Sequence, residues 1–308
     1  GTNGLISGCA NYARVVGNSS VGGIVGEISS FTAGIDDCIN LGAVIAISGY
    51  AGGITGCILN SRQGIKNCMN FGAIDNPEDT SAYNGAGGIC GDFSTTMTAC
   101  ANYGNVSAKK YVGGLVSYLR DSKANLNNSY NHGKIVLNSG NSTTSYCGGI
   151  AGFVADSNKH IFSKCYDVSG GAVFGSVSTS ANISKVYYLE GGIEIGAQPN
   201  VDRFGIDSKT AVQMKKPSFL TTLGQYNANG NGTDDGYYVV NSGSYPVLYW
   251  QQKAVSFDLT PADAAVAVKN SDGTVVAANP DGSYTLILGE TYTYEVTAED
   301  YLSKTGSF

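Results

Sequence analysis

Side chains that could carry acid–base chemistry are few in this 308-residue sequence. Only 14% of the residues are charged, and the histidines are His132 and His160. β-Helical enzymes that cleave glycans group two carboxylates around the scissile bond. The candidates for such a group here, with basic residues beside them, are Asp36-Asp37, Glu78-Asp79, Asp121, Arg62 and Arg120. They do not recur in register and each falls in an expected loop, so we favour solvated turn charges and predict no catalytic residues.

Thiol chemistry is a second possibility, because the sequence contains eight cysteines. There is no Cys-x-x-Cys pair, so a zinc site is not expected. Five cysteines share one position of an internal repeat, where Ser129 replaces a sixth, and such free thiols behave as small buried apolar groups. Disulfides between neighbouring rungs remain an alternative. The five are Cys9, Cys38, Cys68, Cys100 and Cys165.

A third possibility is calcium. The spacing of Asn227, Asn229 and Asn231, followed by Gly232, has the outline of a calcium-binding loop. It lacks the carboxylates of such loops, and its twelfth position is Tyr238 rather than glutamate. A plain Asn/Gly turn is favoured, and we predict neither a metal nor a cofactor.

The elements that would position these residues repeat along the chain. A Gly-Gly-Ile/Leu-x-Gly/Ser sequence begins at residues 22, 52, 87, 113 and 148, and a degraded copy covers 170–175. A Cys-x-Asn sequence precedes the copies, with steps of 29 to 36 residues from one cysteine or its equivalent to the next. Around Asn40 the residues alternate with a period of two, which indicates strands. Repeats of this length, each too small to bury its own apolar face, predict a parallel β-solenoid.

The predicted fold is therefore all-β, with about six coils of roughly thirty residues, stacked about 4.8 Å apart and wound right-handed. Equivalent residues would form columns along the stack. The cysteines would form one column and Asn11, Asn40, Asn70, Asn102 and Asn131 a second. We expect tight turns at Gly23, Gly53, Gly88, Gly114 and Gly149, and a left-handed conformation at Gly42, Gly72, Gly104 and Gly133. Ala13 departs from that last rule, and His132 is a variant of the column of Leu41, Phe71 and Tyr103.

The recurring Gly-Gly-Ile/Leu-Val-Gly sequence resembles the GLUG repeat of large surface proteins of gut and oral bacteria, including the non-catalytic part of immunoglobulin A-cleaving metallopeptidases. The resemblance covers about residues 1 to 190. It implies a β-solenoid on a secreted or wall-attached protein and carries no activity with it. The metallopeptidases need a His-Glu-x-x-His motif, which this sequence lacks.

Three segments are expected: a solenoid over 1–195, a capping segment over 196–252 and an Ig-like β-sandwich over 253–308. In the second, Ser208 would cap a short helix that stops at Pro217, and Leu248 and Trp250 would cap the last coil. The third has short alternating strands with Asp-Gly turns and resembles Ig-like or PEGA-like spacer modules of bacterial surface proteins. It ends about one strand early, so we expect the natural protein to continue.

A binding face is the remaining functional expectation. Tyr50, Tyr111 and Tyr146 stand two residues before glycine pairs and could form an aromatic stripe for a sugar or a peptide, or simply pack. The net charge of −6 and the lack of basic clusters argue against nucleic acid, and no apolar run is long enough to span a membrane.

The sequence thus predicts a non-enzymatic, monomeric fragment of a secreted or surface-attached bacterial protein. It would act as a stalk or an adhesin for a host or microbial glycan or protein. A polysaccharide-active β-helix enzyme and an accessory module of a larger surface peptidase remain alternatives.

Overall fold

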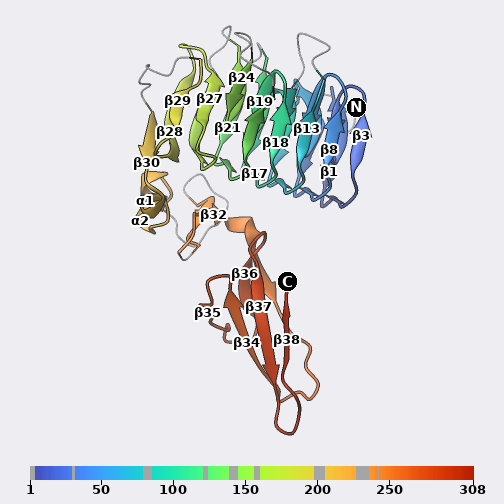
Figure 1. Cartoon of the computed structure of the whole chain (residues 1–308), viewed down its shortest axis with the longest axis vertical. Helices are drawn as coiled ribbons and strands as arrows, with labels where there is room; N and C mark the ends of the chain where they lie inside the picture. Colours follow the sequence, from blue (N-terminus) through green and yellow to red (C-terminus); the bar gives the residue numbers. More distant parts are fainter. Residues whose placement is uncertain are drawn as a thin grey trace. The chain divides into compact units, whose positions relative to one another are not determined.

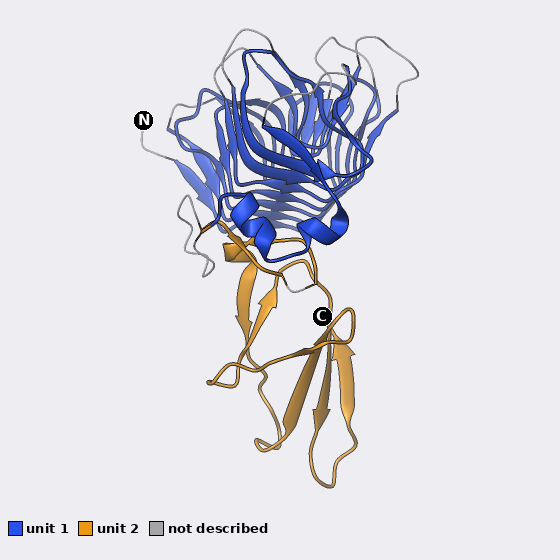
Figure 2. Ribbon diagram, turned by 90° about the vertical axis from the view of Figure 1, so that its left-hand side faces the viewer, with its two compact units in different colours: residues 1–225 blue, residues 226–308 orange. Residues whose placement is uncertain are grey.

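A computed structural model describes residues 4–29, 32–78, 85–120, 124–138, 145–155, 160–197, 205–226, 236–241 and 243–308. The chain divides into two compact units, residues 1–225 and 226–308, which Figure 2 colours separately. The sheets of the first unit are parallel and those of the second antiparallel. The predicted all-β class with a parallel β-solenoid is confirmed. The predicted boundaries at 195 and 252 stay a prediction.

Each regular coil of the first unit contributes five short strands, and equivalent strands of successive coils lie side by side (Figure 1). The first strands are β1 (Leu5–Ser7), β6 (Gly34–Asp36), β11 (Gly64–Lys66), β16 (Thr96–Thr98) and β21 (Asn125–Asn127). The second are β2 (Ala10–Asn11), β7 (Ile39–Asn40), β12 (Met69–Asn70), β17 (Ala101–Asn102) and β22 (Tyr130–Asn131). The third are β3 (Val15–Gly17), β8 (Val44–Ala46), β13 (Ile74–Asn76), β18 (Val106–Ala108) and β23 (Ile135–Leu137).

The fourth and fifth strands lie on either side of the glycine pairs. The fourth are β4 (Val21–Gly22), β9 (Tyr50–Gly52), β14 (Gly85–Gly87), β19 (Tyr111–Gly113) and β24 (Tyr146–Gly148). The fifth are β5 (Val25–Ile28), β10 (Thr55–Leu59), β15 (Cys90–Ser94), β20 (Val116–Leu119) and β25 (Ala151–Val154). The stack then continues less regularly through β26 (Ile161–Asp167), β27 (Ala172–Ser176), β28 (Asn182–Leu189), β29 (Ile193–Ile195) and β30 (Ile206–Lys209).

One contact, repeated in every regular coil, explains both sequence motifs. The asparagine of each Cys-x-Asn sequence packs against the second glycine of the pair in the preceding coil. A Cβ atom on Gly53 would lie 2.4 Å from Cγ of Asn70 and 2.1 Å from the carbonyl oxygen of Gly88, so only glycine fits there. The equivalent pairs are Gly23–Asn40, Gly88–Asn102, Gly114–Asn131 and Gly149–Asp167.

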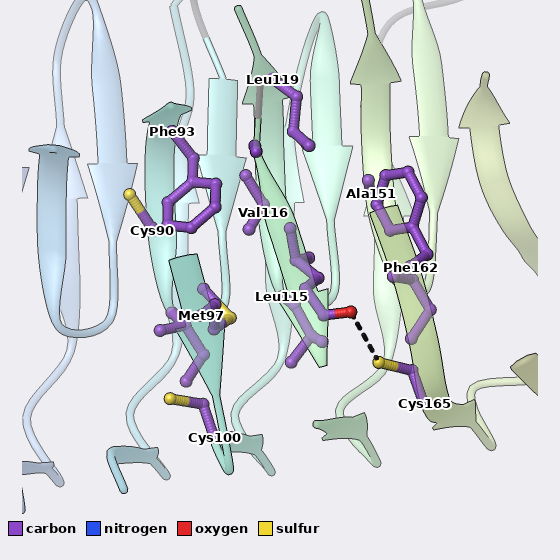
Figure 3. Close-up of a cluster of buried hydrophobic side chains, with 14 of the residues drawn as sticks. Cys90, Phe93, Met97, Cys100, Leu115, Val116, Leu119, Ala151, Phe162 and Cys165 are labelled. Carbon is purple, nitrogen blue, oxygen red and sulfur yellow. Dashed lines mark hydrogen bonds between the residues drawn. The ribbon is translucent and has the colours of Figure 1, made fainter. Parts of the chain in front are cut away.

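This contact lies between two apolar columns that run along the stack of coils. The larger column is formed by the first and fifth strands, the turn residue after each glycine pair and the cysteines that precede the second strands, and Figure 3 shows part of it around Met97 and Leu115. The smaller column is formed by third and fourth strands, with residues such as Val44 and Ala51. The cysteines belong to the larger column, where the Cys165 thiol donates to the carbonyl oxygen of Leu126.

The residues with a left-handed backbone conformation lie at another position of the coil than predicted. Gly42, Gly72, Gly104 and Gly133 do not have positive φ. They are needed because the coil before them passes too close: a Cβ on Gly72 would lie 1.9 Å from the carbonyl oxygen of Gly42. Positive φ occurs instead just before the cysteine column. The residues there are Gly8, Asp37, Asn67, Ala99, Asn128, Lys164 and Lys185.

Two short helices cover the later coils of the first unit. α1 (Ala211–Met214) and α2 (Ser218–Thr222) follow β30. The cap of α1 is Thr210, with Gln213 completing a capping box, rather than the predicted Ser208. Phe219 of α2 packs edge-on against Tyr187 and Tyr166. Leu248 and Trp250, which were predicted to cap the solenoid, belong to the second unit.

The second unit contains three antiparallel sheets. β31 (Tyr238–Val239) pairs with β32 (Val247–Leu248), and a 3-10 helix (Tyr249–Gln251) follows. β33 (Gln252–Val255) pairs with β36 (Tyr284–Ile287). The third sheet runs β35 (Val275–Val276), β34 (Ala265–Asn270), β37 (Tyr292–Thr297) and β38 (Lys304–Ser307). Among the described residues no helix is long and apolar enough to cross a membrane.

Candidate functional site

The cysteine column is buried and chemically quiet. Cys38, Cys68, Cys100 and Cys165 have no exposed surface, and Cys9 alone is exposed, in the first coil. All five are free thiols. Burial raises the pKa of Cys68 well above its ordinary value and that of Cys165 to about 12, so these thiols do not ionise near neutral pH. The four buried cysteines therefore pack the interior of the solenoid.

The asparagine column is a ladder of buried hydrogen bonds. Nδ2 of Asn40 donates to Oδ1 of Asn70 at 2.7 Å and to the carbonyl oxygen of Gly42 at 2.8 Å. The same bonds recur from Asn11 to Asn131, and the ladder ends where Asn131 donates to Asp167. Each Nδ2 group donates both of its hydrogen atoms within the ladder. The ladder therefore fixes the register between coils and leaves no free amide donor for a ligand.

The three tyrosines expected to form a ligand face lie at one register position but are mostly covered. Tyr50 is 6% and Tyr111 is 8% exposed, while Tyr146 is half-buried. Tyr111 and Tyr146 are stacked, with ring centroids 6.1 Å apart. Gly85 holds the same position in the third coil, so the column is interrupted there. Tyr50 and Tyr111 thus serve packing rather than an exposed stripe.

A second row of residues lies beside these rings, and part of it reaches the surface. It occupies the fourth position after the second glycine of each pair, along β5, β10, β15, β20 and β25. Tyr118 and Phe153 of this row are half-buried and stacked, with centroids 5.4 Å apart and planes at 8°. Their neighbours in the row are Glu27, Cys57 and Asp92.

Rings from both rows form one aromatic cluster, which we define as Tyr50, Tyr111, Tyr118, Tyr146 and Phe153. Tyr118 contacts Tyr50 and Tyr111, with centroids 6.2 and 5.4 Å away. Phe153 contacts Tyr111 and Tyr146, at 5.5 and 5.1 Å. The cluster is buried at Tyr50 and Tyr111 and half-buried at its other three rings, so part of its ring surface reaches solvent.

An ion pair borders the aromatic cluster. Nε of Arg120 donates to Oδ2 of Asp92 at 2.6 Å, and the arginine side chain is 45% exposed while that of Asp92 is fully buried. Burial raises the pKa of Asp92, and the Arg120 guanidinium opposes that rise. Oδ1 of Asp92 and the Tyr50 hydroxyl are buried without a hydrogen-bond partner. The partly exposed guanidinium is therefore a hydrogen-bond donor that this surface offers.

Burial also keeps the ionisable groups around the ion pair unreactive. Burial raises the pKa of Cys57 to about 12, with the Asp92 charge as a second cause. Burial also raises the pKa of the Tyr50 hydroxyl. Asp92 is bound by arginine and shielded from solvent, so it has no access to a substrate proton.

The other candidate acid–base residues that the structure describes do not form a constellation. Asp36 accepts a hydrogen bond from Asn67 at 2.9 Å, and Asp37 is one of the positive-φ residues. His132 lies in the column of Phe71 and Tyr103, 3.2 Å from the Tyr166 hydroxyl, and desolvation lowers its pKa to about 3. In the described part of the chain no group of three or more His, Cys, Asp or Glu residues could hold a metal ion. Asp79, Asp121 and the Asn227–Asn231 loop lie outside the described residues.

Comparison with known proteins adds one finding. No family model matches the chain, and no curated protein matches it. A solved structure described as "a putative immunoglobulin A1 protease from Bacteroides ovatus" is similar, with a TM-score of 0.48 and 20% sequence identity. The match covers 80% of this chain and 70% of that chain.

Sequence reasoning missed Asp92, Tyr118 and Phe153, although a signal was present. All three stand four residues after the second glycine of a pair, at a position that also contains Glu27 and Cys57. The identities at this position differ in every coil, whereas the motif positions have few exceptions, such as Ser129 and Asp167. At this position Glu27, Tyr118 and Phe153 reach the surface, whereas Cys57 and Asp92 are buried.

Proposed function

We propose that this chain is a non-catalytic binding module of an extracellular bacterial surface protein, in which GLUG-type repeats form the solenoid and an Ig-like spacer follows. The support is chemical. The repeated positions are occupied mainly by packing thiols, satisfied amides and glycines, and the thiol of Cys57 and the carboxyl group of Asp92, next to the aromatic cluster, are buried with raised pKa values. This leaves the aromatic cluster beside Arg120 as the surface suited to a ligand.

The ligand we propose is a glycan. Flat, partly exposed rings such as Tyr118 and Phe153 can stack against the apolar face of a sugar ring, and the partly exposed guanidinium of Arg120 can donate to its hydroxyl groups. The stacked pair of Tyr118 and Phe153 is the observation that carries the proposal. A protein ligand would instead engage the same rings as anchors, which the experiment distinguishes.

The test is a glycan array probed with the fluorescently labelled full chain, followed by calorimetry with any glycan that binds. Tyr118→Ala and Phe153→Ala should each weaken binding at least tenfold, the loss of about 1.4 kcal/mol expected for an aromatic contact. Tyr118→Phe should bind almost as well as the wild type, because it keeps the ring. Tyr12→Ala is the matched control, since Tyr12 is 77% exposed and lies outside the aromatic cluster.

Three outcomes would contradict the proposal. One is the release of new reducing ends or unsaturated products from the bound glycan, which would indicate an enzyme. Another is glycan binding that Tyr12→Ala weakens as much as Tyr118→Ala does. The third is an array without binding together with capture of a host protein that depends on Tyr118, which would make the ligand a protein.

A further inference from the structure

Two cationic side chains border the aromatic cluster. Arg120 follows Tyr118 by two residues, and its side chain is 45% exposed. Lys110 directly precedes Tyr111, and its Nζ atom lies 5.7 Å from the centroid of the Tyr111 ring. Within the described part of the chain Lys110 belongs to no salt bridge, so no carboxylate there neutralises its charge. Although the chain has a net charge of −6, the rings therefore adjoin two positive groups.

The carboxylate that balances Arg120 is out of reach of solvent. Asp92 is fully buried, and Nε and Nη2 of Arg120 both bind its Oδ2 atom, so Nη1 takes no part in the pair. A ligand in solvent therefore meets the guanidinium and not the carboxylate. The exposed acid of the same row is Glu27, three coils before Tyr118. At ~4.8 Å per coil it stands roughly 14 Å away, which is beyond the screening length of physiological salt.

The row of residues at this position indicates that packing does not require Asp92. The equivalent residue is Cys57 in the preceding coil and Tyr118 in the following one, with the backbone in register. A buried carboxylate whose Oδ1 atom has no partner costs stability that neither of these side chains would cost. What Asp92 adds is a fixed position for the Arg120 guanidinium next to the coil of Tyr118. Costly buried groups of this kind are typical of functional sites.

We propose that the aromatic cluster binds a glycan that carries anionic groups, and that Arg120 and Lys110 select for those groups; this inference rests on the proposed glycan binding. The rings stack on the apolar face of the sugar and do not distinguish a neutral sugar from a charged one. The planar guanidinium fits the paired oxygens of a carboxylate or a sulfate, and Lys110 adds a second charge. A uronic acid and a sulfate ester both present such oxygens, so the experiment includes both.

Calorimetry of the full chain with matched oligosaccharides tests this inference. One pair is an oligouronate and the same oligosaccharide after reduction of its carboxyl groups, and the other is a sulfated oligosaccharide and its desulfated form. The anionic member of at least one pair should bind about tenfold more tightly than its neutral partner, and added NaCl should reduce this preference. The pair that shows the preference identifies the anionic group.

Two variants locate the preference. Lys110→Gln removes a charge and leaves no buried group unpaired, and Arg120→Lys keeps a charge beside Asp92 but lacks the planar fork. Each should reduce the preference about threefold or more, and circular dichroism shows that each has folded. Lys66→Gln is the matched control, because Lys66 is an exposed lysine of β11 outside the aromatic cluster.

Tyr118→Ala separates this inference from the proposed function, because it should weaken both members of a pair by the same factor. Neutral and anionic members that bind equally, both through Tyr118, would overturn the inference and leave the glycan-binding function standing. A preference that survives both Lys110→Gln and Arg120→Lys, or that Lys66→Gln reduces as much, overturns it because the charges would act elsewhere. Absence of binding to all four oligosaccharides overturns it as well, and the glycan array then decides the proposed function separately.

Discussion

Replacing Asp167 with asparagine should change how the stability of the first unit depends on pH. Asp167 ends the buried amide ladder and is 1% exposed. Its carboxylate accepts hydrogen bonds from Nδ2 of Asn131 at 2.8 Å and from the backbone N–H and hydroxyl of Ser169 at 3.2 and 2.8 Å. Burial nevertheless raises the pKa of Asp167 from 3.8 to about 6, since those three donors offset only part of the desolvation.

The sign follows from the pKa values of the folded and unfolded states. Because the folded value is higher, protonated Asp167 stabilises the fold below about pH 4, and this contribution is lost as the pH rises through about 6. A difference of about two pKa units corresponds to about 3 kcal/mol, at ~1.36 kcal/mol per unit. Asparagine keeps an acceptor for Asn131 and has no charge, so the variant should not show this loss.

The assay is urea unfolding of the wild type and Asp167→Asn at a series of pH values from about 3 to 8. The free energy of unfolding of the wild type minus that of the variant should fall by about 3 kcal/mol across this range, with most of the change near pH 4 to 6. Circular dichroism follows the solenoid, while fluorescence of Trp250, the only tryptophan, reports the second unit and should not change. Asp207→Asn, at an exposed position of β30, is the control.

A difference that does not vary with pH would refute this reasoning. So would a variant that is less stable than the wild type at pH 7.5, because the three donors would then outweigh the desolvation of the carboxylate.

Three further substitutions test how the coils pack. Gly53→Ala should destabilise the first unit by about 3 kcal/mol or more, because its Cβ would overlap Asn70 and the carbonyl of Gly88, whereas Gly4→Ala, with nothing within 4 Å, should be neutral in thermal unfolding. Equal effects of the two would disprove the close contact. Lys164→Asn should stabilise by up to about 1 kcal/mol, because asparagine tolerates the positive φ of 54° better than lysine, and an unchanged midpoint in urea would contradict this. Ser117→Ala should stabilise by about 1 kcal/mol, since the buried hydroxyl has no partner, and a lower melting temperature would show that the hydroxyl is satisfied after all.

The coil and its register could be predicted because they depend on spacing. A Cys-x-Asn sequence recurring about every thirty residues places Asn40 beside Asn70 only if the coils stack in parallel, and the structure pairs these residues in that way. The stack follows from the sequence since each coil is one period long and no coil can bury its apolar face alone.

The role of individual glycines could not be predicted in the same way. A glycine is required either by positive φ or by a close neighbour, and the sequence alone does not distinguish the two. Gly72 follows an asparagine and was assigned positive φ, yet it is required by the carbonyl of Gly42. The positive φ falls on Asp37 and Asn67, which do favour it, but also on Lys164, which does not. Lys164 adopts this conformation because the neighbouring coils impose it.

The candidate surface was predicted only in part, because the sequence does not show which rings are buried and which reach the surface. Sequence reasoning selected Tyr50 and Tyr111 by their distance from the glycine pairs. It could not foresee that Tyr118 of the following strand would contact Tyr111 in its own coil and Tyr50 two coils away, because such contacts depend on the orientation of each side chain. Arg120 was noted as a charge in a loop, but its partner Asp92 is buried and stands at a position where other coils have Cys57 or Phe153.

The division between constant and variable positions bears on what this solenoid binds. Close packing between coils fixes the glycine positions, because a Cβ atom there would meet a neighbouring coil within about 2 Å. The fourth position after the glycine pair escapes this constraint and changes from Glu27 through Asp92 to Phe153 while the backbone stays in register. If the ligand were a polymer read one unit per coil, these side chains should be alike at each ~4.8 Å step. They are not, so a single site at the third to fifth coils, where the rings and Arg120 meet, agrees better with the structure than a continuous track along the stack.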